Sequence, residues 1–145
     1  MNQLNLRELS LKDYPLNAYD KIRFGDTDKQ GHVNNAVFST FLETGRVELL
    51  YSSVNPLTQF GGSFVIASLK LDLIEEITWP GTVEIGTAVS KIGNSSIGMI
   101  QGLYQNEKIV ATAETVIVQI DKESKRSKPL PQEIKDILIN YMMKL

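Results

Sequence analysis

The sequence predicts an α+β protein in which an antiparallel β-sheet wraps around one long, buried helix. Two observations lead to this prediction. Residues 37–50 are mostly apolar with helical spacing, and four segments of alternating apolar and polar residues follow from about residue 64 onward. A twisted sheet built from the later segments would cover the helix and give both elements a common core.

The whole chain, residues 1–145, is expected to form a single domain. Its length is near the usual size of one domain, and a hydrophobic content of 42% is enough to fill one core. No repeat, low-complexity tract or linker divides the chain.

A strand, a turn and the long helix are the first predicted elements. The mixed pattern of residues 14–24 suggests a strand that ends at the turn-forming segment 25–28. Apolar residues at spacings of three and four then mark the helix from Phe38 to Leu50. Gly45 costs this helix about 1 kcal/mol relative to alanine, which predicts that another element approaches closely there.

Four strands and a short helix complete the prediction. In the first strand we expect Val65, Ala67, Leu69, Leu71 and Leu73 on one face. Turns rich in Gly, Pro, Asn and Ser separate the strands, and Pro131 begins an amphipathic helix. The predicted strands cover residues 64–77, 83–89, 97–104 and 109–120, and the helix covers about 131–143.

Composition narrows the range of functions. Fifteen basic and seventeen acidic residues give a net charge of -2, so the chain as a whole does not attract nucleic acid or an anionic membrane. No segment approaches the ~20 apolar residues of a membrane span, and the charged N-terminal region does not resemble a signal peptide, so we expect a cytoplasmic protein. Without cysteine and with one histidine, the sequence predicts no disulfide, no thiol nucleophile, no metal site and no cofactor.

The segment that can carry chemistry is residues 24–35, at the junction of the first strand and the long helix. Backbone N–H groups in the first turn of a helix have no partner within the helix, so they can stabilise a developing oxyanion. A carboxylate shortly before that turn could attack a carbonyl carbon or activate water. The junction therefore offers both parts of an acyl-transfer site.

Simpler interpretations of the same residues remain open. Asp26 and Asp28 could be turn and capping residues, because aspartate is favoured in both settings. Their spacing with Gly31 also resembles the start of a calcium loop, but Gln30 and Val37 occupy positions where that loop needs oxygen ligands. We therefore exclude calcium.

The remaining polar residues of the segment have structural alternatives as well. His32 could be a hydrogen-bonded residue at the helix start, and Asn34 and Asn35 could be helix caps. The common nucleophile, P-loop, zinc-protease and dinucleotide-binding motifs are absent from the sequence.

A family resemblance covers most of the chain, from about Tyr19 to Pro131. Residues 24–28, followed by 31–35 and by Glu43–Arg46, resemble the 4-hydroxybenzoyl-CoA thioesterase branch of the hotdog-fold superfamily. The specific part is the string Asp-x-Asp-x-x-Gly-His-Val-Asn-Asn directly before a buried helix. The resemblance implies the hotdog fold, an antiparallel sheet wrapped around a long central helix, and hydrolysis of acyl thioesters.

The resemblance also implies roles for three residues. Asp28 matches the family's catalytic carboxylate, acting as nucleophile or as general base for water. The backbone N–H of Asn35 matches the oxyanion donor. His32 matches a histidine of the related plant acyl-carrier-protein thioesterases, but Gln30 stands where they have asparagine, so His32 is a supporting candidate only.

Substrate-binding positions follow from the same resemblance. They are Gly31, Val33, Asn34, Phe38 and Ser96, with the acyl chain along the central helix near Phe38 and with Ser96 near the pantetheine arm. Phe38 could equally be an ordinary core residue, and Ser96 could serve only to shape a hairpin. The substrate would be an acyl-CoA or an acyl-ACP, and the lack of a basic patch slightly favours coenzyme A. Pairing of exposed sheet edges predicts a homodimer or homotetramer.

Three rival functions remain. One is a hotdog protein that binds acyl thioesters without hydrolysing them. The second is a dehydratase or hydratase of the same superfamily, although its paired histidine and acid motifs are absent. The third is an unrelated interaction module, which would leave the segment from Asp28 to Asn35 without a role.

Overall fold

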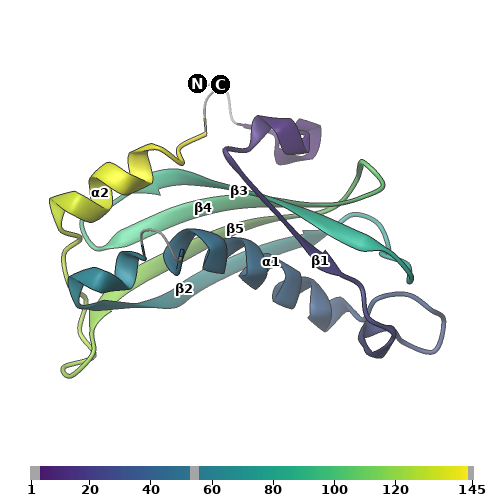
Figure 1. Ribbon diagram of the computed structural model, residues 1–145, viewed down its shortest axis with the longest axis horizontal. Helices are drawn as coiled ribbons and strands as arrows, with labels where there is room; N and C mark the ends of the chain where they lie inside the picture. The colour runs from purple at the N-terminus through teal and green to yellow at the C-terminus, as the bar shows by residue number, and fades with distance from the viewer. Residues whose placement is uncertain (1–3, 53–55, 144–145) are drawn as a thin grey trace.

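The computed structural model describes residues 4–52 and 56–143, and it confirms the α+β prediction. Five strands form one sheet around a central helix, as in the hotdog fold (Figure 1). The elements are β1 Leu16–Lys21, α1 Asn35–Leu50, β2 Gly62–Leu73, β3 Thr82–Ile92, β4 Ser96–Gln105, β5 Lys108–Asp121 and α2 Gln132–Ile139. Short 3-10 turns cover Leu6–Glu8, Leu11–Asp13, Phe24–Asp26 and Leu57–Phe60. No helix of the described ranges is long and apolar enough to cross a membrane.

The sheet has the strand order β1-β3-β4-β5-β2, and every neighbouring pair is antiparallel. The three hairpin-linked strands β3, β4 and β5 form the predicted meander, while β1 and β2 are the two edges. Several predicted boundaries differ from the structure. The last helix ends at Ile139 and not at about residue 143, because Tyr141 and Met143 hydrogen-bond to Val89 of β3. The first strand ends at Lys21, because Phe24–Asp26 turns the chain, and β2 ends at Leu73, because the amides of Ile74 and Glu75 both turn to the carbonyl of Val110.

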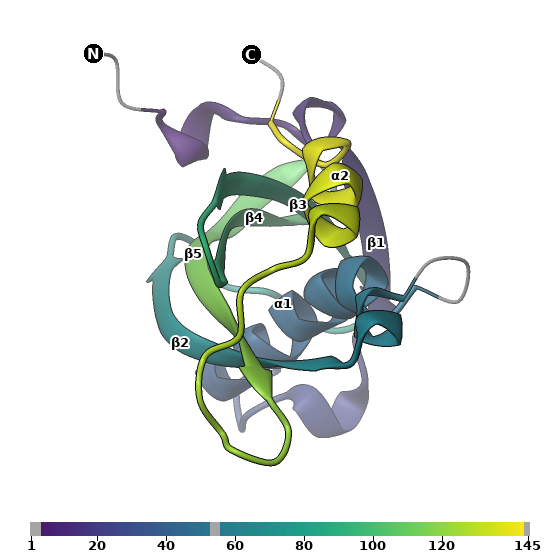
Figure 2. The ribbon, with the colours of Figure 1, turned by 90° about the vertical axis from the view of Figure 1, so that its left-hand side faces the viewer.

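The concave side of the sheet holds α1 (Figure 2). Phe38, Phe41 and Leu42 are buried against β3, β4 and β5, and removing such side chains from water stabilises the fold by about 1.5–3 kcal/mol each. At Gly45 a Cβ atom would lie 2.5 Å from Thr87 Oγ1 and 2.6 Å from Gln101 Nε2. The close approach predicted at this glycine is therefore confirmed.

Strand β2 departs from the predicted alternation. A β-bulge between Ile66 and Ser68 shifts its register against β5, so Val65 and Leu69 do not share a face. Ile66 and Leu69 both pair with helix-facing positions of β5, yet they are 50% and 39% exposed. The prediction that Val65, Ala67, Leu69, Leu71 and Leu73 share one face was wrong, because one extra residue reverses the alternation.

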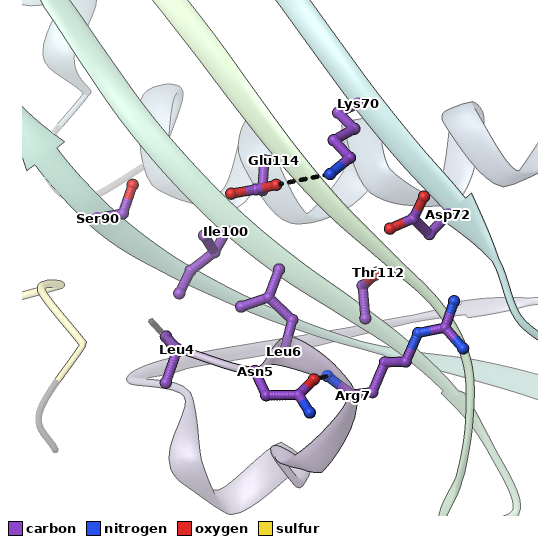
Figure 3. A pocket seen from close by; sticks show the side chains of 10 residues that line it. All are labelled: Leu4, Asn5, Leu6, Arg7, Lys70, Asp72, Ser90, Ile100, Thr112 and Glu114. Carbon is purple, nitrogen blue, oxygen red and sulfur yellow. Dashed lines mark hydrogen bonds and ion pairs between the residues drawn. The ribbon is translucent and has the colours of Figure 1, made fainter. Parts of the chain in front are cut away.

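The outer face of the sheet is covered in part by the N-terminal segment. Leu9 and Tyr14 pack with Ile100 and Tyr104, and the Tyr104 hydroxyl donates a 2.6 Å hydrogen bond to the carbonyl of Leu9. Between residues 4–7 and the sheet lies a hollow of about 380 Å³ with side chains of both charges (Figure 3). The sheet separates this hollow from α1, so it is not part of the predicted site.

Candidate active site

The loop that precedes α1 is fixed to the loop between β2 and β3. The amide of Val33 donates to the carbonyl of Ile77 at 2.8 Å, and the amide of Trp79 donates to the carbonyl of Gly31 at 3.3 Å. Gly31 has a φ of 80°, a conformation that side chains other than glycine rarely adopt. Hydrogen bonds to the loop between β2 and β3 therefore set the position of this loop at the helix start.

Asp26 holds the first half of this loop. Its buried carboxylate accepts hydrogen bonds from the Arg23 amide at 2.8 Å and from Arg23 Nη2 at 2.9 Å. Burial by itself raises the pKa of the carboxyl group, but the hydrogen bonds and charge of Arg23 outweigh it, and the pKa of Asp26 lies below its usual range. The turn-forming interpretation fits Asp26.

Asp28 has a different environment. Its Oδ1 atom accepts the amides of Gln30 at 2.8 Å and His32 at 3.3 Å, which closes the turn. Its Oδ2 atom has no hydrogen-bond partner among the described residues, and the side chain is exposed in the single chain. One carboxylate oxygen is therefore held by the backbone, and the other is available to a reacting group.

The first turn of α1 leaves one amide free. Asn34 caps the helix, since its side chain accepts the Ala36 amide at 3.0 Å and its carbonyl accepts the Val37 amide at 2.8 Å. The amide of Asn35 has no hydrogen-bond partner in the described part of the chain. The helix start therefore offers the amide that the resemblance selects, and the neighbouring amides are occupied by the protein itself.

Asp28 and Asn35 line the same hollow, of about 330 Å³, between the start of α1 and the end of β2. Its remaining walls come from Gln30, His32, Val33, Phe38 and residues 73–76. The Nε2 atom of His32 lies 3.1 Å from Glu76 Oε2, while Glu75 pairs with Lys108 at 2.8 Å. An acidic side chain thus orients the single histidine at the edge of the hollow.

Five of the predicted site residues come together, and three do not. Asp28, His32, Val33, Asn35 and Phe38 line the hollow. Gly31 and Asn34 instead shape the loop and cap the helix. Ser96 begins β4, whose other end, Gln105, is bonded to Thr78 beside the site. Ser96 is therefore ~30 Å from the hollow of its own chain, and its role stays a prediction.

The sequence interpretation did not identify Glu76. Residues up to 77 were expected to continue β2, where alternating side chains would have placed Glu75 and Glu76 on opposite faces. The paired acidic residues next to the Pro80-Gly81 turn were the available signal of a loop. Within the described ranges, no group of three or more His, Asp or Glu side chains is arranged to hold a metal ion.

The sheet wrapped around a central helix defines a hotdog protein, with Asp28 and Asn35 in one hollow at the start of that helix. The sequence matches the Thioesterase-like superfamily over residues 22–138, and the chain belongs to that superfamily. Its membership in the 4-hydroxybenzoyl-CoA branch stays a prediction.

Three individual proteins are similar to this chain over most of its length. The uncharacterized protein YsmA of Bacillus subtilis is 26% identical over 124 residues, 82% of each protein. The PA5185 protein of Pseudomonas aeruginosa has a similar structure, with a TM-score of 0.83, 25% identity and coverage of 93% of this chain and 96% of that one. A thioesterase of Thermus thermophilus, solved with coenzyme A and Zn, has a TM-score of 0.79, 28% identity and coverage of 92% and 99%.

Proposed function

We propose that the protein is an acyl-CoA thioesterase that releases the free acid and coenzyme A. The observation that carries this proposal is that the free Oδ2 of Asp28 and the unpartnered amide of Asn35 belong to one hollow. A thioester carbonyl between them would meet a nucleophile or base on one side and an oxyanion donor on the other. Membership in a thioesterase-like superfamily supports the same chemistry.

The proposed reaction uses these two groups in sequence. The carbonyl oxygen accepts the Asn35 N–H, and either Asp28 Oδ2 or a water molecule that Asp28 deprotonates attacks the carbonyl carbon. The C–S bond of the tetrahedral intermediate then breaks, and the thiolate leaves and takes up a proton. If Asp28 attacks directly, water hydrolyses the acyl-aspartate in a second step. A thiolate is a good leaving group, so this site requires no strong general acid.

We also propose a homodimer formed through β2. This edge strand exposes Val65, Ile66, Leu69 and Leu73, which are 39% to 50% accessible in the single chain. The strand is 12 residues long, and an exposed edge that carries such apolar side chains is a template for pairing with a second copy. Such pairing would cover this edge and enclose the hollow beside Asp28, which lies next to the end of β2.

Antiparallel pairing of two β2 edges would bring the far end of the partner's sheet toward this hollow. That end carries the β3–β4 hairpin with Asn94 and Ser96. The Leu130 amide donates to the Asn94 carbonyl at 2.8 Å, which holds the segment after β5 against this hairpin. The adjoining loop contains four basic residues, Lys122, Lys125, Arg126 and Lys128, so the expected lack of a basic patch does not hold at this end of the sheet. Phosphates of coenzyme A would find cations there, and the coenzyme A complex of the Thermus thermophilus relative supports this carrier over acyl-ACP.

Release of free thiol from short, medium, long and aromatic acyl-CoA substrates tests the proposal. We expect Asp28→Asn to lower kcat/KM at least ~100-fold, because the amide loses the charge that attacks or accepts a proton. The amide oxygen can still accept the Gln30 and His32 amides, so the turn is retained. Asp26→Asn is the matched control and should lower activity much less.

Two outcomes would contradict this proposal. Equal activity of Asp28→Asn and the parent protein would exclude Asp28 as the catalytic carboxylate. Binding of acyl-CoA without thiol release by the parent protein would identify a non-catalytic binder instead.

A further inference from the structure

A second hollow lies further along α1, on the same side of the sheet as the candidate active site. It has a volume of about 120 Å³ and is lined by Glu43, Arg46 and Tyr51 of the helix region and by Phe64 and Ile66 of β2, among others. The Glu43 side chain is exposed and forms no ion pair with Arg46 among the described residues, so a bound carboxylate would have to contact the buried guanidinium and keep clear of this acid. Between the two hollows, the helix-facing residue Leu69 is exposed. The helix-facing side chains of Leu69 and Leu71 therefore form an apolar strip on β2 between the two hollows.

Arg46 is a buried cation with few partners. It is 5% exposed, and no carboxylate of the described residues lies within 4.0 Å of its guanidinium. Its one hydrogen bond within the described ranges runs from Nη1 to Gln101 Oε1 and is long, at 3.4 Å. A guanidinium has five N–H donors, so most of its hydrogen-bonding capacity is unused.

This arrangement is costly unless an acceptor completes it. Taking an ion out of water costs several kcal/mol, which only well-placed partners offset. Burial lowers the pKa of Arg46, and the nearby Glu43 opposes this effect without forming an ion pair. The Gln101 side chain cannot rotate to shorten its hydrogen bond with Arg46. Its Nε2 atom already donates to the Leu42 carbonyl at 2.9 Å and to Thr87 Oγ1 at 3.0 Å.

We propose that Arg46 binds a carboxylate at the far end of the acyl group, so that the preferred substrates are thioesters of dicarboxylic acids. The inference rests on the proposed thioesterase function and specifies the class of acyl group that the substrate carries. The apolar strip would hold the methylene chain, and the guanidinium would bind the distal carboxylate in a charge-assisted, two-pronged contact.

The length of the helix indicates the length of the chain. Arg46 follows Asn35 by eleven residues, or ~16 Å along the helix axis. Its side chain leans back toward the helix start, which shortens the path to the oxyanion site. An extended alkyl chain advances ~1.3 Å per bond, so an acyl group of roughly ten carbons spans ~11 Å, which matches the separation once the back-leaning arginine side chain has shortened it by ~5 Å.

Binding can be measured without catalysis, with two coenzyme A analogues in which a methylene group replaces the thioester sulfur. One carries a decanoyl group, and the other carries the ten-carbon diacid. Calorimetry on the parent protein should show at least ~10-fold tighter binding of the diacid analogue, since a buried polar partner discriminates strongly against a ligand that lacks the matching group. In Arg46→Met this preference should disappear, while the affinity for the decanoyl analogue stays within a few fold.

The Arg46→Met variant separates a role of Arg46 in ligand recognition from a structural role. A buried ion replaced by an apolar residue of similar size is often neutral for stability, so Arg46→Met should fold. If it does not, Arg46→Lys keeps the charge without the planar fork and should reduce the preference for the diacid. A role of Arg46 in holding Gln101 alone would change stability but not the ratio of the two affinities.

Each outcome decides between the two proposals. Equal affinity of both analogues for the parent protein would overturn the inference and leave the thioesterase proposal intact. Failure of either analogue to bind, together with absent thiol release, would overturn both. If Arg46→Met weakens self-association and the parent protein shows no preference for the diacid, the buried cation serves a carboxylate of the partner subunit, and the inference is wrong.

Discussion

Replacing Asn35 with proline would remove the proposed oxyanion donor and little else. Asn35 is the first residue of α1, the helical position that best tolerates proline, because its N–H takes no part in the helix. The preceding residue, Asn34, has φ -59° and ψ 135°, which is the extended conformation that a following proline requires. The backbone is therefore already suited to the substitution, and no hydrogen bond within the described structure is lost.

The expected effect on catalysis is large. Loss of one oxyanion-hole donor typically lowers kcat by 10² to 10³, or about 3–4 kcal/mol of transition-state stabilisation. Stability should not fall, and a compatible proline can raise the free energy of unfolding by about 0.4–1 kcal/mol. Asn35→Ala is the matched control, because it removes the side chain and keeps the amide, so its activity should stay close to that of the parent.

Thiol release under saturating acyl-CoA gives kcat, and thermal unfolding of the same preparations reports stability. The reasoning is refuted if Asn35→Pro is stable and retains the parent's kcat. It is equally refuted if Asn35→Ala loses as much activity as Asn35→Pro, because the side chain and not the amide would then be the important group.

The remaining predictions concern two other acidic residues, Glu76 and Asp26. Since His32 is the single histidine, ¹⁵N spectra report its ring alone. Glu76→Ala should increase the Nδ1–H tautomer, because the Glu76 Oε2 atom lies 3.1 Å from His32 Nε2 and its charge favours a proton on that nitrogen, whereas Glu75→Ala should leave the spectrum unchanged. An unchanged spectrum in Glu76→Ala would show that the pair does not orient the ring. Asp26→Asn should lower the free energy of unfolding at pH 7 by about 1–2 kcal/mol, since hydrogen bonds to an ionised group are lost. The pKa of Asp26 is lowered in the folded protein, so its stabilising effect is complete above pH ~4 and disappears as the pH falls through the folded-state pKa. Urea unfolding of both proteins should therefore give converging values in acid, and a constant difference would exclude the ion pair with Arg23 as the cause.

Local sequence patterns predicted the elements whose cause is local. The apolar spacing of α1 and the alternation in β3, β4 and β5 were sufficient to place these elements, and Gly45 correctly indicated a close approach. Side chains from Asp28 to Phe38 are adjacent in the chain, so their convergence at the helix start was accessible from the motif. The roles of these residues in catalysis stay predictions.

Features that depend on distant parts of the chain could not be predicted in this way. The bulge in β2 arises from pairing with β5, some fifty residues away, and nothing in the alternation of β2 itself signals it. Glu76 meets His32 only because β2 stops at Leu73 and the loop turns back toward the helix start. Arg46 is likewise buried because α1 packs against β4, where its partner Gln101 lies.

The N-terminal segment has a consequence for how copies of this protein can assemble. Two hotdog sheets can stack back to back only where their convex surfaces are bare, and here residues 4–14 occupy that surface with Leu9 and Tyr14 inserted among sheet side chains. A tetramer made by such stacking would have to lift this segment and break the contact of Tyr104 with Leu9. In a dimer paired through β2 as proposed, residues 4–14 would therefore form part of any contact that adds further copies over this area of the convex surface.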